Sequence, residues 1–324
     1  MTVSIIIAVK TWQRNLEECV VKCIELPQSN FEIIILPDEH FSADVLPKQT
    51  SVPITIIPTA RVTPAKKRDL GITHAKGEIL AFLDDDAYPD KGWLVSALRH
   101  FQDSEVAAVA GPAVTPATDS IRQKASGEVY SSLLVSGSYG YRYYPKRQRE
   151  VDDYPSCNFL VRKSVMEEMG GFNTNFWPGE DTKLCLEITK KLRKKIIYDP
   201  QVLVFHHRRP LFAPHLKQIA SYALHRGYFV KRYRETSLRA AYFIPSVFLA
   251  ALVIGAVFSL FFPALISIYI AGLLCYFVLV LLEAIRKKPR LILYVFLGIV
   301  LTHLTYGAYF IKGLCVKRLP EEEE

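Results

Sequence analysis

Three long apolar runs near the C-terminus constrain this chain more than any other feature. They cover residues 242–262, 264–282 and 291–314. Each is close to the roughly 20 residues that cross about 30 Å of hydrocarbon as a helix. Core helices of a water-soluble domain would carry polar faces, which these runs almost entirely lack. The sequence therefore predicts a transmembrane region of about three helices over residues 241–316, followed by a charged tail at 317–324.

The charges around these runs predict the orientation of the chain. The loop Arg286-Lys287-Lys288-Pro289-Arg290 is basic and is expected in the cytoplasm by the positive-inside rule. The first two runs then form a hairpin, and the N-terminal domain is cytoplasmic too. The third run would leave the tail outside, although Lys317 and Arg318 favour the cytoplasmic side. We expect a multi-pass protein of the cell membrane.

The first 210 residues have the pattern of an α/β domain. Short apolar runs indicate buried strands at 3–9, 31–36, 54–57, 79–83 and 106–110. Helical spacing lies between them at 15–26, 65–75 and 93–101, and later at 158–169 and 181–192. Strands that alternate with helices predict a mostly parallel, Rossmann-like sheet with helices on both faces. In such sheets ligands bind at the carboxyl ends of the strands.

An amphipathic helix at 214–233, within the region 211–240, is expected to lie at the membrane interface. One side carries Leu216, Ile219, Tyr222 and Ala223, and the other offers Lys217, Arg226, Lys231 and Arg232 to lipid headgroups. The net charge of +8 suits anionic lipids or phosphorylated substrates. Nucleic acid is not expected as a partner, because no recognition motif accompanies the charge.

The ends of the chain and its cysteines give two further expectations. No signal peptide precedes the first strand, since Met1-Thr2-Val3-Ser4 has no basic leader. The six cysteines form no disulfide framework, so we expect reduced thiols.

Three consecutive acids, Asp84-Asp85-Asp86, directly follow the expected strand at 79–83. Carboxylates at positions i and i+2 after a strand can converge on one divalent cation, and oxygen ligands suit Mg²⁺ or Mn²⁺. Such a cation stabilises the charge that develops on a nucleoside diphosphate leaving group. The alternative is a solvated acidic turn. The position at the carboxyl end of a sheet favours the metal site.

Several spaced motifs resemble the inverting family-2 glycosyltransferases of the GT-A fold. That family has an Arg-Asn-x-Gly-Ile helix, an Ala-x-Gly-Glu segment and a strand that ends in Asp-x-Asp. The matching blocks here are 64–72 and 75–86, followed by 158–162, 170–172 and 179–181. The resemblance covers roughly residues 3–230. It implies a GT-A nucleotide-sugar-binding domain at 1–210, in front of the interfacial and transmembrane helices.

The resemblance also implies roles for single residues. Asp86 would bind the metal, and Asp84 would lie near the ribose or the metal. The nucleotide-binding positions would be Ala8, Val9, Asp38, Arg68, Asp84 and Asp85. The chain departs from the family at Ala8, Thr11, Pro37 and Asp69, where Pro, Asn, Asp and Asn are common. These departures leave the identity of the nucleotide base undetermined, with uracil as the first choice.

Glu180-Asp181 resembles the acidic pair of the family, whose second member is the general base. An inverting transfer needs a carboxylate that accepts the proton of the attacking hydroxyl. Asp181 also opens an expected helix, so a plain N-cap is the alternative. An imidazole of His206 or His207 could complete the metal shell, and we choose His207. Arg226 resembles a phosphate-binding arginine of polysaccharide-forming members; contact with lipid headgroups is the alternative.

The resemblance implies a membrane-bound, metal-dependent, inverting glycosyltransferase of the hexosyltransferase type. Its expected donor is a UDP-sugar, and its expected acceptor is a polyprenyl-linked lipid used in polysaccharide assembly. A polyprenyl-phosphate sugar synthase is the close alternative, and an inactive membrane scaffold is the non-enzymatic one. A processive synthase is less expected, because a full Gln-x-x-Arg-Trp motif is missing. The donor sugar depends on a few hydrogen bonds that no spacing reveals.

Overall fold

A computed structural model of the chain describes residues 1–28, 30–47 and 50–322. It has two compact units. The sheet unit comprises Met1–Val114, Tyr141–His207 and the described part of Pro320–Glu324, and the helical unit comprises Thr115–Gly140 and Arg208–Leu319. The segment 115–140, inside the expected domain of residues 1–210, groups with the C-terminal helices, and the expected domain bounds stay a prediction.

Among the described residues, eight strands of the sheet unit form one sheet, in the order β3-β2-β1-β4-β9-β6-β10-β8. The strands are β1 (Val3–Ala8), β2 (Phe31–Leu36), β3 (Ile54–Ile56), β4 (Ile79–Asp84), β6 (Val106–Ala110), β8 (Arg149–Val151), β9 (Asn158–Arg162) and β10 (Lys195–Tyr198). Pairing is parallel from β3 through β4 and between β6 and β10. It is antiparallel around β9 and at β8. The mostly parallel α/β sheet expected from the sequence is confirmed.

The strand β9 lies where the sequence analysis expected a helix at 158–169. That prediction was wrong over its first five residues, and only α6 (Lys163–Met169) is helical. The side chains of Phe159, Leu160 and Val161 are buried at 1%, 0% and 0% exposure, between β4 and β6. Burial on both faces of a sheet removes the alternation that distinguishes a strand from a buried helix.

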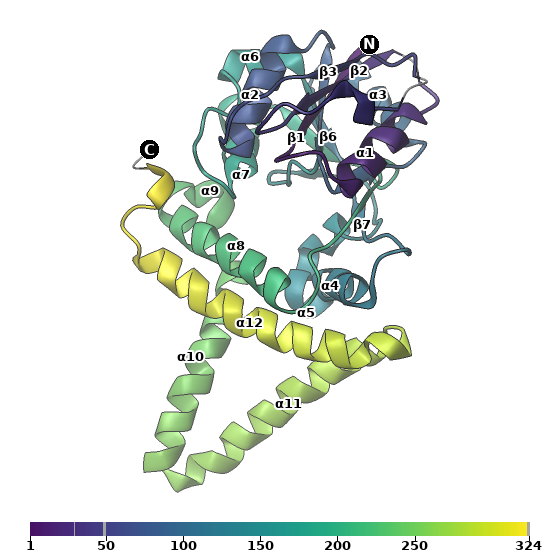
Figure 1. The fold of residues 1–324 in the computed structure, drawn as a ribbon. Coiled ribbons are helices and arrows are strands. Elements are labelled where there is room, and N and C mark those ends of the chain that lie inside the picture. Colours follow the sequence, from purple (N-terminus) through teal and green to yellow (C-terminus); the bar gives the residue numbers. More distant parts are fainter. Residues whose placement is uncertain (29, 48–49, 323–324) are drawn as a thin grey trace. The chain divides into compact units, whose positions relative to one another are not determined.

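Helices cover both faces of this sheet (Figure 1). They are α1 (Arg14–Ile24), α2 (Pro64–His74), α3 (Trp93–Leu98), α6 and α7 (Glu180–Leu186). Helices α1 and α3 share one core with the side chains of Val3, Ile5 and Ile7 on β1. Helix α2 covers the other face, where a Cβ on Gly71 would lie 2.8 Å from Cγ2 of Ile6. Alternate β1 side chains therefore serve two cores.

A small three-stranded sheet adjoins the carboxyl end of β4. It consists of β5 (Ala87–Pro89), β11 (Val204–His206) and β7 (Ala113–Val114), in the order β5-β11-β7. Strand β11 runs antiparallel to β5 and sets His206 opposite Ala87, next to the three acids.

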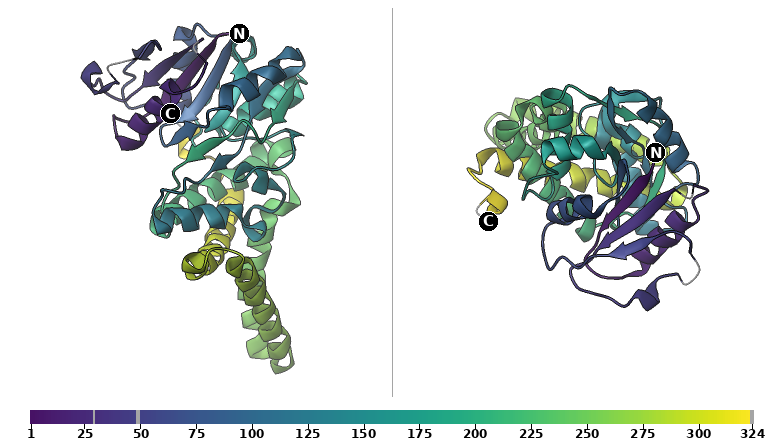
Figure 2. Two further views of the ribbon diagram at one scale, coloured as in Figure 1. Left: turned by 90° about the vertical axis from the view of Figure 1, so that its right-hand side faces the viewer. Right: turned by 90° about the horizontal axis from the view of Figure 1, so that it is seen from above.

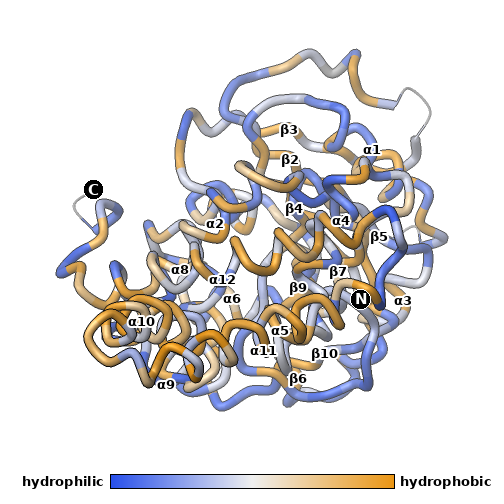
Figure 3. The backbone as a smooth tube through the Cα atoms, turned by 90° about the horizontal axis from the view of Figure 1, so that it is seen from below, coloured by the Kyte–Doolittle hydropathy of each residue, from blue (hydrophilic) through white to orange (hydrophobic). Residues whose placement is uncertain are grey.

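The helical unit contains the apolar C-terminal region. Its helices are α4 (Ile121–Ser131), α5 (Leu133–Ser136), α8 (Ala213–Arg232), α9 (Arg234–Ser237), α10 (Ala240–Phe261), α11 (Ile266–Ile285) and α12 (Ile292–Cys315). Among the described residues, three helical segments are long and apolar enough to cross a membrane: Ala240–Phe261, Pro263–Ile285 and Pro289–Glu322. The tube of Figure 3 is predominantly orange along α10 and α11. These two helices form a hairpin that extends away from α8 and α12 (Figure 2).

The buried face of α8 differs from the expected one. Ile219 and Ala223 are buried, but Tyr222 is 43% exposed. The buried face continues through His215, His225, Gly227, Tyr228 and Phe229. The difference arises because α8 packs lengthwise on α12, a partner that sequence periodicity does not identify. All six cysteines are free thiols, as expected.

Candidate active site

The acids at the end of β4 gather beside one imidazole. Among the described residues, Asp84, Asp86 and His206 each offer a ligand atom, and these atoms lie within 4.8 Å of one another. The Nε2 atom of His206 lies 2.9 Å from Oδ1 of Asp86. Two carboxylates and an imidazole form a donor set that fits a divalent cation such as Mn²⁺. Burial raises the pKa of Asp84, with Asp86 adding to the effect and Arg68 opposing it.

The structure favours His206 over His207 as the third ligand. Neighbouring residues of a strand point to opposite faces, so the two imidazoles diverge. The ring of His207 packs against Tyr88 at 5.7 Å, on the face where Tyr88 also stacks on Phe205. Its Nε2 lies 3.2 Å from Oε2 of Glu18 on α1. His206 shares the face of Asp86 and is the better placed of the two, and the expected role of His207 stays a prediction.

Asp85 turns towards α1 and away from this cluster. Its Oδ2 accepts a hydrogen bond of 2.8 Å from Nε2 of Gln13, the N-cap residue of α1. Burial, followed by the charges of Asp86 and Asp84, raises the pKa of Asp85 to about 7. The contact with Gln13 gives Asp85 a structural partner, and its expected role in nucleotide binding stays a prediction.

Arg68 connects β4 with α7. Its Nη2 donates to Oδ1 of Asp84 and its Nη1 donates to Oε1 of Glu180, both at 2.8 Å. The Arg68 side chain is only 4% exposed. Burial by itself would lower the pKa of Arg68, but the two carboxylates outweigh it and raise the pKa above its ordinary value. The guanidinium therefore stays charged and holds Asp84 in place relative to Glu180.

The members of the acidic pair differ in accessibility. Glu180 is buried, with Oε1 bound to Arg68 and Oε2 accepting the N–H of Gly179 at 3.0 Å. Asp181 is only partly buried at the N-terminus of α7, and its Oδ1 accepts the N–H of Thr182 at 2.8 Å. The geometry is consistent with an anchoring role for Glu180 and leaves Asp181 as the candidate base.

Lys67 is a site residue that the sequence analysis missed. Its Nζ donates to the carbonyl oxygens of Val9 at 2.5 Å and Leu36 at 3.3 Å, and it forms an ion pair with Asp38. Lys67 thereby ties together the ends of β1 and β2, where the base was expected. Ala8 sits beside Asp84 across the β1–β4 ladder. The run Lys66-Lys67-Arg68 contains no signal that singles out its middle member.

Asp69, which the sequence analysis named only as a departure from the family, has a structural role that was not expected. Its two carboxylate oxygens accept the N–H groups of Phe172 at 2.7 Å and Asn173 at 3.1 Å. Gly171 has φ +85°, and a Cβ there would lie 2.9 Å from Cγ of Asp69. The Gly170-Gly171-Phe172 motif thus makes room for this carboxylate in the loop that precedes α7. Burial raises the pKa of Asp69, although the two backbone N–H groups oppose the shift.

Arg226 belongs to the helical unit. Its Nη1 donates to Oγ of Ser237 at 3.3 Å, and its guanidinium lies 4.9 Å from the centroid of the Tyr242 ring. A role in phosphate binding stays a prediction.

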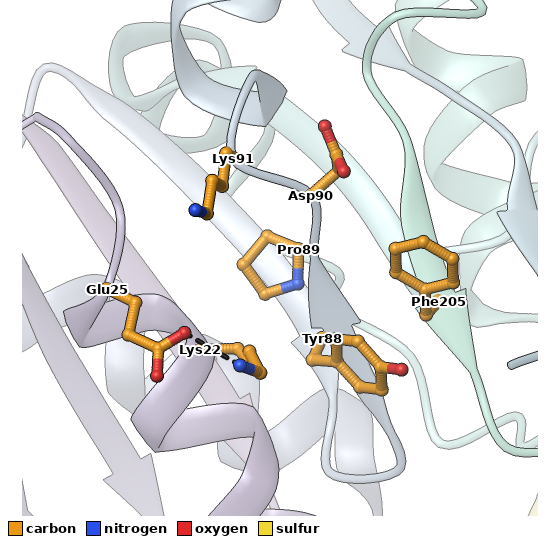
Figure 4. Close-up of a pocket in the computed structure, with 7 residues that line it drawn as sticks. All are labelled: Lys22, Glu25, Tyr88, Pro89, Asp90, Lys91 and Phe205. Carbon is orange, nitrogen blue, oxygen red and sulfur yellow. Dashed lines mark hydrogen bonds and ion pairs between the residues drawn. The ribbon is translucent and has the colours of Figure 1, made fainter. Parts of the chain in front are cut away.

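A small hollow lies on the other face of the β5–β11 ladder (Figure 4). It measures about 190 Å³ and is lined by Lys22, Glu25, Tyr88, Pro89, Asp90, Lys91 and Phe205. The rings of Tyr88 and Phe205 stack with centroids 5.2 Å apart. Lys22 and Glu25 form an ion pair at its edge. The acidic cluster is therefore not part of this hollow.

Residues 4–170 of the 324 in the chain match the family model of "Glycosyl transferase family 2". The chain belongs to glycosyltransferase family 2. The resemblance carried by the blocks at 64–72 and 75–86 is thereby confirmed.

Curated relatives match part of the chain. It is 35% identical over 150 residues to the pre-mycofactocin glycosyltransferase of Mycobacterium tuberculosis, covering 45% of this chain and 30% of the relative. It is 22% identical over 146 residues to the glucosyl-dolichyl phosphate glucuronosyltransferase of Haloferax volcanii, covering 43% and 46%. The chain spans less than half the length of these relatives.

A solved structure resembles nearly the whole chain. The mannosyltransferase PcManGT from Pyrobaculum calidifontis, in complex with GDP-Man and Mn²⁺, superposes with a TM-score of 0.64. The superposition covers 98% of this chain and 88% of the PcManGT chain, at 18% sequence identity. This likeness confirms the GT-A fold expected from the sequence.

Proposed function

We propose that this chain is a membrane-bound, inverting hexosyltransferase. It moves a sugar from a nucleotide-sugar, with a UDP-sugar as the expected donor, to a lipid-linked polyprenyl acceptor in cell-surface polysaccharide assembly. The observation that carries the proposal is the arrangement of Asp84, Asp86 and His206, joined through Arg68 to the acidic pair of α7.

The donor would bind at the carboxyl ends of β1, β2 and β4. Asp84, Asp86 and His206 would hold Mg²⁺ or Mn²⁺, which when bound neutralises charge on the diphosphate leaving group. Mn²⁺ accompanies the nucleotide-sugar in the complex of PcManGT, which supports a divalent cation here. Lys67 holds Asp38 and the Val9 carbonyl, and so shapes the expected base site.

The transfer would be a single displacement. The acceptor oxygen attacks C1 of the sugar, the bond from C1 to the diphosphate oxygen breaks, and its electron pair leaves with the nucleoside diphosphate. Asp181 takes the proton of the attacking hydroxyl. Glu180, bound to Arg68 and to the backbone of Gly179, keeps the start of α7 in place.

The acceptor and the location follow from the apolar helices. A chain embedded in a bilayer meets lipid-borne acceptors at the membrane surface. The Haloferax relative is named for transfer onto glucosyl-dolichyl phosphate, which supports a lipid-linked acceptor. We infer that the sheet unit lies in the cytoplasm and that the protein resides in the cell membrane.

Nucleotide release tests the proposal. Detergent-purified protein is incubated with a panel of UDP- and GDP-sugars and native lipid extract, with and without EDTA. We expect release that EDTA abolishes, that Asp86→Ala eliminates and that Asp181→Asn lowers by roughly 10² to 10⁴-fold. Glu105→Gln, on the surface beside Lys194, is the matched control and should retain full activity.

The outcomes separate the alternatives. A phosphate acceptor is already ionised and needs no base, so full activity of Asp181→Asn would favour a polyprenyl-phosphate sugar synthase. Folded protein that releases nucleotide from no donor would favour the inactive scaffold.

A further inference from the structure

Helix α12 is packed against protein along its whole length. Its buried residues recur every three or four positions on one face: Val295, Gly298, Ile299, Thr302, His303, Gly307, Phe310 and Gly313. A third of its most apolar window, 33%, is buried, against 11% for α10 and 6% for the α11 segment. Length and composition allow α12 to cross a bilayer, but its packing differs from that of the other two helices.

Helices α4, α10 and α11 pack on parts of α12, and the most extensive contact is with α8, which runs parallel to it (Figure 1). Near the start, Nε2 of His215 lies 3.0 Å from Oγ1 of Thr302. Near the end, Nζ of Lys231 donates to the carbonyl oxygen of Leu314 at 2.9 Å. Between these points a Cβ on Gly227 would lie 3.1 Å from Cα of Gly313. If α12 crossed the membrane, α8 would have to cross beside it.

The sequence of α8 does not permit such a crossing. Lys217 and Arg232 are both exposed and lie 232 − 217 = 15 residues apart, or about 22 Å along the helix. That is less than the roughly 30 Å hydrocarbon thickness, so at least one exposed cation would lie in hydrocarbon. Charged side chains at that depth are costly and are rare unless they face protein or a water-filled cavity. Lys217 is exposed on the surface of the helical unit.

Both ends of α12 are tied to the side of the membrane that holds the sheet unit. At its start, Nζ of Lys287 lies 2.9 Å from Oε2 of Glu128 on α4. Helix α4 begins 121 − 114 = 7 residues after β7 of the sheet unit, a reach of at most about 25 Å. At its end, α12 is followed at Pro320 by residues that belong to the sheet unit.

We propose that α12 lies along the bilayer surface on the side of the sheet unit, and that only the α10–α11 hairpin enters or crosses the membrane. The outer face of α12 lies against the lipids, at the boundary between their headgroups and acyl chains. The large apolar side chains exposed on this face are Leu293, Leu297 and Ile311. An interfacial helix presents such an apolar face to the acyl boundary. Lys317 and Arg318 then stay in the cytoplasm, contrary to the topology expected from three crossings.

Cysteine accessibility tests the topology. The exposed Cys275 and Cys315 are replaced by serine, which leaves the four buried cysteines. Single cysteines are then introduced by Lys288→Cys, Glu322→Cys and, as a marker of the sheet unit, Lys91→Cys. Sealed vesicles of both orientations are treated with a membrane-impermeant maleimide. We expect all three sites to react from the same side; reaction of Glu322→Cys from the side opposite Lys288→Cys would overturn the proposal.

A depth measurement provides an independent check that leaves the tail unaltered. Nitroxide labels are placed through Leu293→Cys, Leu304→Cys and Ile311→Cys, with Val253→Cys in α10 as the deep reference. An interfacial helix gives similar, shallow depths at all three α12 positions. A crossing helix would place Leu304→Cys as deep as Val253→Cys and the other two near the surface, which would contradict the proposal.

Discussion

At the scale of the residue, a single peptide unit of β11 decides which imidazole faces the acids. His206 and His207 are neighbours, yet one lies 2.9 Å from Asp86 and the other 3.2 Å from Glu18. Their chemistry is identical, so only the phase of the strand separates them. That phase is set by the register with β5, where His206 lies opposite Ala87.

This pair of histidines makes a matched test of the metal site. We expect His206→Ala to raise the Mn²⁺ concentration needed for half-maximal nucleotide release by roughly tenfold or more, because loss of a ligand or of its support typically costs that much affinity. His207→Ala should leave it nearly unchanged. Mn²⁺ binding followed by electron paramagnetic resonance gives the same comparison without turnover. Equal shifts in the two variants would contradict the assignment.

Asp69 allows a test of the loop that precedes α7. Asp69→Ala leaves the N–H groups of Phe172 and Asn173 without their acceptor. We expect it to lower the free energy of unfolding by about 1–3 kcal/mol. Asp69→Asn keeps one acceptor oxygen, so its free energy of unfolding should lie between those of the unaltered protein and Asp69→Ala. Asp90→Ala is the control, since Asp90 is exposed and its Oδ2 accepts the N–H of Gly92 at 3.2 Å. Urea unfolding of purified protein measures the differences, and equal losses for Ala at both positions would contradict the role.

The sequence identified some of these residues and missed others for a physical reason. Asp84 and Asp86 follow a strand, and a strand end has a fixed place at the edge of a sheet. Lys67 and Asp69 lie on a helix, where the side on which each points depends on how α2 rotates against the sheet. No local pattern shows which polar side chains of α2 then turn inward.

At the scale of the element, the close contact between α8 and α12 depends on Gly227 and Gly313. A Cβ on Gly313 would lie 2.9 Å from the backbone nitrogen of Tyr228. A Cβ on Gly272 of α11 would meet nothing within 4 Å. Gly313 and Gly272 both lie in apolar helices of similar length, so they differ mainly in whether another helix packs against them.

We therefore expect opposite effects of the same substitution. Gly313→Ala forces the two helices apart and should destabilise the helical unit by about 1–3 kcal/mol, the usual cost of overpacking. Gly272→Ala should be neutral or slightly stabilising, because alanine is the better helix former. Thermal unfolding in a mild detergent compares the two. A loss in Gly272→Ala as large as in Gly313→Ala would contradict the packing described for α12.

Elements were predictable where burial leaves a periodic trace. β1, β2 and β4 are short apolar runs between helices, and the sequence placed them within a residue or two. β9 was taken for a helix because both of its faces are covered. On α8 the period was visible, but the partner that fixes its buried face lies some 85 residues further on, as in the pairing of Lys231 with Val316.

At the scale of the whole molecule, the two units interleave along the chain. The segment Thr115–Gly140 leaves the sheet unit, packs in the helical unit and returns. Its Ala125 and Val129 are buried with Leu211, Val295 and Ile299. The sequence pattern loosens in this segment and gave no sign of a change of unit, since its partners lie far along the chain. The domain expected at residues 1–210 was drawn without this excursion.

This interleaving predicts which truncation of the chain stays soluble. A chain that ends at His207 keeps Thr115–Gly140 but loses α8, α11 and α12, so Ala125 and Val129 become exposed. Exposed apolar surface of this kind promotes aggregation.

Replacing Thr115–Gly140 in that shortened chain by a Gly/Ser linker of equal length removes the surface, and flexible loops cost little extra stability as they lengthen. We expect the linker version to be a soluble monomer with a cooperative thermal transition, and the plain truncation to aggregate. Both keep Asp84, Asp86 and His206, so Mn²⁺ binding by the linker version would show that the acidic cluster needs no helical unit. Size-exclusion chromatography separates the cases, and equal solubility of both would mean that Thr115–Gly140 is not held by the helical unit.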